Sequence, residues 1–158
     1  MSDLKPFAYT KYLGVKRPII VSKDPNMKKG NITFQDQALM YVGKKIDKES
    51  VEKAVITFYK REAKRIITKR INAHMPQIRI KPRSVTIDGD NTKWGTCNGN
   101  RDITFHWMLA MYPMEAIDYV VVHELCHLKH LNHDRSFWRL VGKIMPNYKE
   151  AQKMIHDV

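Results

Sequence analysis

The most informative segment of the chain is residues 117–133, which read IDYVVVHELCHLKHLNH. Pro113 precedes it, and proline is favoured in the first turn of a helix, so we expect a helix from about Pro113 to His127. Residues four apart on a helix lie one turn apart on nearly the same face, so His123 and His127 can bind one metal ion. Glu124 lies beside that face, where its carboxylate can accept a proton from a metal-activated water. The spacing H-E-x-x-H therefore predicts metal-assisted hydrolysis.

A third protein ligand is needed, because catalytic zinc usually takes three protein ligands and one water. His133 follows His127 by six residues, so the helix has to end between them for His133 to face the same ion. In the spacing H-E-x-x-H-x-x-G-x-x-H a glycine stands at that break, and His130 occupies its position here. Histidine and asparagine tolerate the left-handed region, which makes a break between His130 and Asn132 feasible. We expect His133 to be the third ligand, with His130 as the alternative.

Outward from the motif, a long helix is expected over residues 48–74. Apolar residues recur there at intervals of three and four, which is typical of an amphipathic helix. Asp47 or Ser50 can cap this helix, and we expect Pro76 to end it. Two shorter helices are expected near the end of the chain, the first capped by Asp134 or Ser136 and the second containing Ala151, Met154 and Ile155.

Short alternating segments between turn residues predict strands in the rest of the chain. The expected strands are residues 12–15, 17–21, 32–34, 38–42, 78–80, 84–87 and 103–105. Asn98-Gly99-Asn100 is expected to form a hairpin turn. The fold class is therefore α+β, expected as one domain over residues 1–158 with an N-terminal β elaboration in 1–45 and a catalytic core in 46–158.

The charge balance is strongly basic. The chain has 28 Lys+Arg against 16 Asp+Glu, which gives a net charge of +12. Most of that excess lies between Lys44 and Arg83, where Lys60, Lys64 and Arg65 are candidates for contacting phosphates or a nucleic acid nonspecifically. A solvated helix face explains the same pattern.

Composition also limits the location and the class of protein. Two cysteines, Cys97 and Cys126, exclude a disulfide framework and suit a reducing compartment. The first residues lack the apolar segment of a signal peptide, and no apolar run is long enough to cross a membrane. We therefore expect a cytoplasmic protein with no membrane partner.

The motif and its surroundings resemble a known family. The segment His123–His127, then His133 and Phe137-Trp138, is similar to the YgjP-like metallopeptidases. It is also similar to the Wss-like group of DNA–protein crosslink proteases and, more distantly, to the Spartan/SprT-like proteases. The segments Lys93–Cys97 and Ile103–Trp107 resemble two strands of the YgjP-like family, with Thr96 where serine is common.

The resemblance implies a zincin-like core, in which a small sheet lies beside the active-site helix. It implies one zinc ion per chain held by His123, His127 and His133, with Glu124 as general base. It also implies that the strand near residues 103–106 binds an extended peptide by strand addition.

The expected function is a zinc-dependent metallopeptidase, specifically a metalloendopeptidase acting on proteins or peptides. Trp94, His106 and Arg135 are candidate substrate-binding residues, and the oxyanion donor is sought among Arg135, Tyr148 and His106. One alternative is a metal-dependent nucleotide pyrophosphohydrolase, and another is a DNA-associated protease whose basic helix binds nucleic acid. The oligomeric state is left open.

Overall fold

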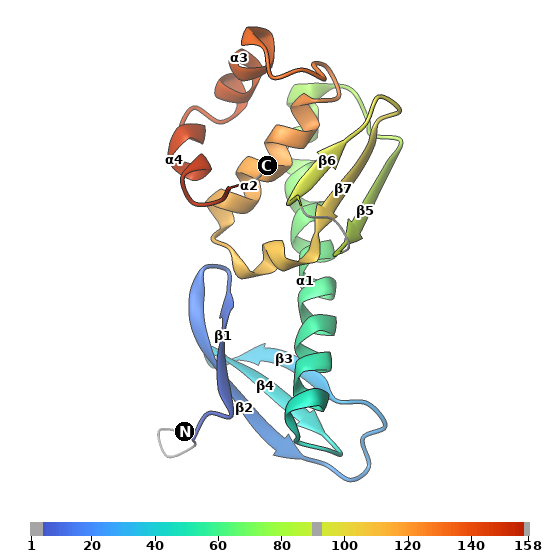
Figure 1. Ribbon diagram of the computed structural model, residues 1–158, viewed down its shortest axis with the longest axis vertical. Helices are drawn as coiled ribbons and strands as arrows, with labels where there is room; N and C mark the ends of the chain where they lie inside the picture. The colour runs from blue at the N-terminus through green and yellow to red at the C-terminus, as the bar shows by residue number, and fades with distance from the viewer. Residues whose placement is uncertain (1–4, 90–92, 157–158) are drawn as a thin grey trace.

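A single long helix, α1 (Lys48–Ile78), runs through most of the length of the molecule. The computed structural model describes residues 5–89 and 93–156. Figure 1 shows a β-sheet beside the first half of α1, whereas the remaining helices and a second sheet lie beside its second half. The two halves share α1 and one connected hydrophobic core.

The first sheet contains the N-terminal strands. It has the order β1-β2-β4-β3, with β1 (Ala8–Tyr12) antiparallel to β2 (Val15–Lys23), and β2 parallel to β4 (Ala38–Gly43). β3 (Asn31–Gln35) is antiparallel to β4. The expectation of one strand over residues 12–15 is wrong, because Leu13 (φ 50°) and Gly14 (φ 84°) form the tight turn between β1 and β2.

α1 begins as expected and ends later than expected. The side chain of Asp47 caps the helix by accepting a hydrogen bond from the Ser50 N–H, at 2.8 Å. Pro76 does not end the helix, because a proline near the C-terminus forfeits only one helical hydrogen bond while Ile78 in the same turn is fully buried. The helix ends at Arg79, which has φ 64° and donates its N–H to the carbonyl of Met75. The strand expected at residues 78–80 is therefore absent.

The second sheet has the order β5-β7-β6. β5 (Ser84–Asp88) is parallel to β7 (Asp102–His106), and β6 (Gly95–Cys97) is antiparallel to it. Residues 98–100 form the expected turn between β6 and β7.

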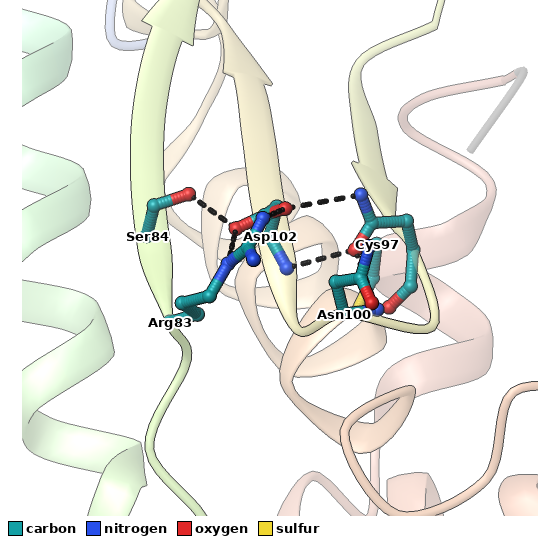
Figure 2. A network of polar contacts seen from close by, with 6 residues as sticks. Arg83, Ser84, Cys97, Asn100 and Asp102 are labelled. Atoms are coloured by element: carbon teal, nitrogen blue, oxygen red, sulfur yellow. Dashed lines mark hydrogen bonds and ion pairs between the residues drawn. The ribbon is translucent and has the colours of Figure 1, made fainter.

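A polar network around Asp102 fastens this turn to β5 (Figure 2). Arg83 donates two hydrogen bonds to the Asp102 carboxylate, and Ser84 and Asn98 donate one each. The hydrogen bonds from Arg83 and Ser84 hold the pKa of Asp102 far below its usual range. The carboxylate therefore stays charged and links β5, β7 and the turn.

The remaining elements are helices, which follow β7. They are the 3₁₀ helix η1 (Trp107–Met111), α2 (Met114–Cys126), α3 (Arg135–Ile144) and α4 (Tyr148–Gln152). α2 carries the H-E-x-x-H motif and is buried on nearly all sides, as expected of a helix that is apolar all round. Asp134 caps α3 by accepting from the Phe137 N–H, whereas Met154 and Ile155 lie beyond the end of α4.

The turn between β1 and β2 joins the two halves of the molecule. The N–H groups of Leu13 and Gly14 donate to the carbonyls of Ala110 and Met111, at 2.9 and 2.8 Å. The expected α+β fold class, with a small sheet beside the motif helix, is confirmed. Within the described ranges, no helix is long and apolar enough to span a membrane.

Candidate metal centre

The chain leaves the helical path directly after the motif. α2 ends at Cys126, and the N–H groups of Leu128 and Lys129 donate to the carbonyls of Leu125 and Cys126, three residues back. None of residues 127–133 has a positive φ, so the expected left-handed residue between His130 and Asn132 is not found. A tightened last turn reverses the chain instead and brings His133 back to the motif.

Three imidazoles meet at this reversal. The Nε2 atom of His133 lies 3.1 Å from Nε2 of His127 and 3.2 Å from Nε2 of His123. Nitrogen ligands about 2.0–2.1 Å from a tetrahedral zinc ion lie about 3.3–3.4 Å from one another. The spacing of the three histidines therefore fits a single metal ion, and within the described residues they form the group able to hold one.

The other ring nitrogen of each motif histidine is occupied by a neighbouring oxygen. Nδ1 of His127 lies 2.9 Å from the carbonyl oxygen of His130, and Nδ1 of His123 lies 3.2 Å from Oε2 of Glu124. A hydrogen bond from Nδ1–H leaves the Nε2 lone pair for a metal. His130 contributes its backbone carbonyl, and its side chain is outside the three-histidine group.

Aromatic rings from α3 hold two of the imidazoles. Phe137 stacks on His127 with ring centroids 4.4 Å apart, and Trp138 stacks on His133 at 5.9 Å. Burial lowers the pKa of both His127 and His133, which favours the neutral ring that binds metals. Phe137 and Trp138 were noted only for their resemblance to the family, and their contact with the histidines was not predicted, although they lie just after His133 in the sequence.

Glu124 is only 2% exposed and lies against the backbone of β6. A Cβ atom added at Gly95 would lie 2.8 Å from Cγ of Glu124, so a larger residue there would displace the Glu124 side chain. Glu124 and the three histidines line a cavity of about 210 Å³, called the histidine cavity from here on. The other lining residues are Lys93, Gly95, Thr96, Cys97 and Leu131.

Cys97 lines the histidine cavity, whereas Cys126 does not. Burial, together with the charge of Glu124, raises the pKa of Cys97 to about 11, and burial raises that of Cys126 to about 12. Both thiols are therefore protonated at neutral pH.

The three candidate substrate-binding residues lie outside the histidine cavity. The Trp94 ring packs on His106 and on Tyr112, with centroids 5.3 and 4.9 Å apart. His106 caps η1, because its Nδ1 accepts from the Met108 N–H at 3.0 Å. Arg135 is exposed in the first turn of α3.

Tyr148, a candidate oxyanion donor, reaches the histidines only indirectly. Its ring stacks on Trp138 with centroids 5.5 Å apart, and Trp138 in turn stacks on His133. The histidine cavity is also lined by Lys93, Gly95 and Thr96. These residues were not predicted as site residues, although they lie in the segment Lys93–Cys97 that resembles the family.

The expectation that the strand near residues 103–106 binds an extended peptide is wrong. β7, which contains residues 103–106, is the central strand of its sheet and has partners on both sides. β6 is an edge strand, and it lines the histidine cavity. An extended peptide can therefore add to β6 but not to β7.

The candidate phosphate-binding residues lie along α1. The Lys60 ammonium lies 6.0 Å from the centre of the Trp107 ring, and Arg65 pairs with Glu62 at 2.9 Å. Lys64 is exposed. None of these three residues lines the histidine cavity, so any phosphate contact by them would be separate from the metal centre.

No curated protein matches the chain. Among solved structures, the metallopeptidase zymogen abylysin of Pyrococcus abyssi is similar, with a TM-score of 0.49 and 24% identity over 55% of this chain and 89% of that chain. The family model of the YgjP-like metallopeptidase domain matches residues 2–157. The chain therefore belongs to the YgjP-like metallopeptidase family, a family of metal-dependent hydrolases.

Proposed function

We propose that the protein is a zinc metallopeptidase with one zinc ion per chain, held by His123, His127 and His133. The observation that carries this proposal is the convergence of three imidazole Nε2 atoms, 3.1 and 3.2 Å apart, beside the buried Glu124. Three neutral nitrogen ligands with one open position are typical of catalytic zinc.

Zinc bound there would lower the pKa of a water molecule and polarise the carbonyl group of a substrate. Glu124 acts as the general base that takes the proton from this water and returns it to the leaving amine. The close approach of Gly95 restricts the Glu124 side chain, so its carboxylate is already positioned before substrate binds. His130, through its carbonyl, and Phe137, through ring stacking, keep His127 oriented for the metal.

The substrate is a protein or peptide bound in an extended conformation along β6. An edge strand offers backbone N–H and C=O groups that pair with any extended chain, irrespective of its side chains. Such pairing engages an internal segment of the substrate, which suits an endopeptidase.

The central test is Glu124→Gln, which keeps the shape of the side chain and removes the base. We expect kcat/KM on an unfolded protein substrate to fall about 10²–10⁴-fold while one zinc per chain is retained. Glu115→Gln is the matched control, because Glu115 is exposed in the first turn of the same helix. A Glu124→Gln protein that cleaves as fast as the parent would show that the base is assigned wrongly.

A second candidate function, hydrolysis of nucleotide phosphoanhydrides, draws support from Lys93. This lysine lines the histidine cavity, where an ammonium group can attract phosphate oxygens. The same Glu124→Gln pair, assayed on a panel of nucleoside triphosphates, separates the two functions. Phosphoanhydride cleavage that exceeds peptide cleavage and depends on Glu124 would favour this second function.

The two cysteines support a proposed cytoplasmic location. Cys97 and Cys126 are both free thiols, and Cys126 is buried. Free thiols persist in a reducing compartment. Labelling of both thiols in protein isolated from cells under acidic quench would test this.

A further inference from the structure

The backbone of β6 has an open edge beside the metal centre. The His106 N–H donates to the Trp94 carbonyl at 2.9 Å, which extends the β6–β7 ladder by one pair beyond Gly95. In an antiparallel ladder the residues that bond to the neighbouring strand alternate along the chain, so Trp94 and Thr96 face β7. The N–H and C=O groups of Gly95 and Cys97 therefore point toward the open edge, where a substrate strand pairs.

The side chains of β6 divide between two faces. The Cα–Cβ direction of Gly95 points at Glu124, so this face of the strand looks toward α2. Successive side chains on a strand point to opposite faces. Trp94 therefore lies on the other face, where it packs on His106 of the paired strand.

A second cavity begins at Trp94, one residue along from Gly95. It has a volume of about 520 Å³, more than twice that of the histidine cavity. We call it the methionine cavity, because its lining includes Met108, Met111 and Met154 together with Trp94, Tyr112 and Lys11. Met108 and Met111 come from η1 and Met154 from the segment after α4, so two separate parts of the chain meet the start of β6 here.

We propose that the methionine cavity is a specificity pocket for a large apolar side chain of the substrate, two to three residues from the scissile bond. The inference rests on the proposed peptidase function, because it assumes that a substrate strand lies along β6. A strand advances about 3.3–3.4 Å per residue, so a chain whose scissile bond lies beside Glu124 passes Trp94 within about two residues. Side chains of that strand that face the same way as Trp94 enter the cavity.

The chemistry of the lining favours leucine, methionine and phenylalanine side chains. Methionine is unbranched and flexible, so a methionine-lined pocket adapts to apolar groups of different shapes. Aromatic rings of Trp94 and Tyr112 add flat apolar surface. A charged or strongly polar substrate side chain would lose its hydration there without a matched set of hydrogen-bond partners.

A different apolar cavity provides the control. It has a volume of about 540 Å³, lies between β1 and the first turns of α1, and is lined in part by Ile56 and Val55. It belongs to the N-terminal half of the molecule and is lined by no residue of β6 or α2. A charge placed at Ile56, which is 38% exposed, should therefore leave peptide selection unchanged.

The test uses the zinc-loaded protein and a peptide library in which one position at a time is varied. We expect the parent to prefer leucine, methionine or phenylalanine over glycine by about 10-fold or more at one position, two or three residues from the cleaved bond. Met154→Glu is the first variant, because Met154 is 45% exposed and its replacement should not disturb the fold. Met154→Glu and Met108→Glu should each remove most of this preference, whereas Ile56→Glu should retain it.

A binding measurement separates failure of this inference from failure of the proposed function. Dissociation constants of the leucine and glycine peptides are measured on zinc-loaded Glu124→Gln protein, with and without Met154→Glu. Tighter binding of the leucine peptide that Met154→Glu abolishes would support the pocket, even if the parent cleaved no peptide and the proposed function had failed. Equal binding of the two peptides, or a preference that both methionine variants leave intact, would overturn it.

Discussion

The two halves of the molecule along α1 use buried side chains in opposite ways. In the N-terminal sheet the buried side chains are aliphatic and aromatic, such as Ile19, Ile32 and Leu39. Beside the second half of α1, the structure buries His123, Glu124 and His127, which are the buried polar residues among those it describes. Burial of polar groups costs free energy unless partners or a metal compensate, so this cluster of three buried polar residues needs compensation of that kind. The comparison places the buried polar residues of the described chain beside the second half of α1.

The two halves also differ in the surfaces that they present. The N-terminal sheet reaches the second half through the turn at Leu13 and Gly14, whose N–H groups bond to the backbone just before α2. The second half in turn presents the edge of β6 and two adjoining cavities. If this division is correct, substitutions in the N-terminal half should change stability alone, and those around the histidine cavity should change metal binding or activity.

Removal of the third histidine should have the largest effect. We expect His133→Ala to weaken zinc binding more than about 100-fold, because loss of a direct ligand exceeds the 10–100-fold effect of losing a residue that only supports a ligand. Competition with a chromophoric chelator measures this affinity. His130→Ala is the matched control, because His130 acts through its carbonyl, and it should bind zinc like the parent. If His130→Ala lost zinc instead, the third ligand would be misassigned.

Replacement of glycine tests the comparison directly, because each half contains a glycine packed against a side chain. A Cβ at Gly95 would meet Glu124 at 2.8 Å, and a Cβ at Gly43 would meet the Tyr41 hydroxyl at 2.2 Å. Each alanine substitution should lower the free energy of unfolding by about 1–3 kcal/mol through overpacking. Only Gly95→Ala should also lower kcat/KM, because it displaces Glu124. Equal loss of activity per folded molecule in both variants would break the proposed division.

The ion pair between α1 and α2 should have an intermediate effect. Asp118 accepts from Arg70 at 2.5 Å and lies 3.2 Å from Nε2 of His74, and its side chain is 17% exposed. Burial raises the pKa of Asp118, but hydrogen bonds and charges of His74 and Arg70 outweigh it and leave the pKa below its usual value. Asp118→Asn should lower the free energy of unfolding by about 1.5–3 kcal/mol at neutral pH, the range for hydrogen bonds to charged groups.

The pH dependence of that ion pair has a definite sign. Because the folded pKa is depressed, the stabilisation is fully present above the unfolded value of about 4 and is lost as pH falls through the folded pKa. Urea titrations between neutral and acidic pH should show a gap between the parent and Asp118→Asn that closes in acid. A gap that widened in acid would contradict the assignment.

Neutralisation of the α1 cations should have the smallest effect. Arg61 donates to the carbonyl of Ile32 and Arg70 pairs with Asp118, so part of the basic stretch already serves the fold. If the exposed Lys60, Lys64 and Arg65 contact phosphates, changing all three to Gln should weaken nonspecific DNA binding and lower its salt slope by up to about 3. Peptide cleavage should not change. An unaltered salt slope would indicate that these residues form a solvated helix face.

Sequence patterns predicted the elements better than their boundaries. The caps at Asp47 and Asp134 and the turn at 98–100 were predictable, because each depends on residues within a few positions of one another. The end of α1 was not, because burial of Ile78 in the tertiary core outweighs the cost of Pro76. The contacts of Trp94 and His106 were not predictable for a similar reason, since they depend on the pairing of β6 with β7.

Local sequence was enough to predict the candidate metal ligands on α2 and the candidate base. The i, i+4 spacing of His123 and His127 and the adjacent Glu124 follow from helix geometry, which is a local property of the backbone. Three features could be seen only in the folded chain, namely the return of His133 to the motif, the edge position of β6 rather than β7, and the methionine cavity at Trp94. These depend on contacts between distant segments. The order of strands and the meeting of η1, β6 and the C-terminal segment are set by which surfaces bury one another, and local spacing carries no information about that.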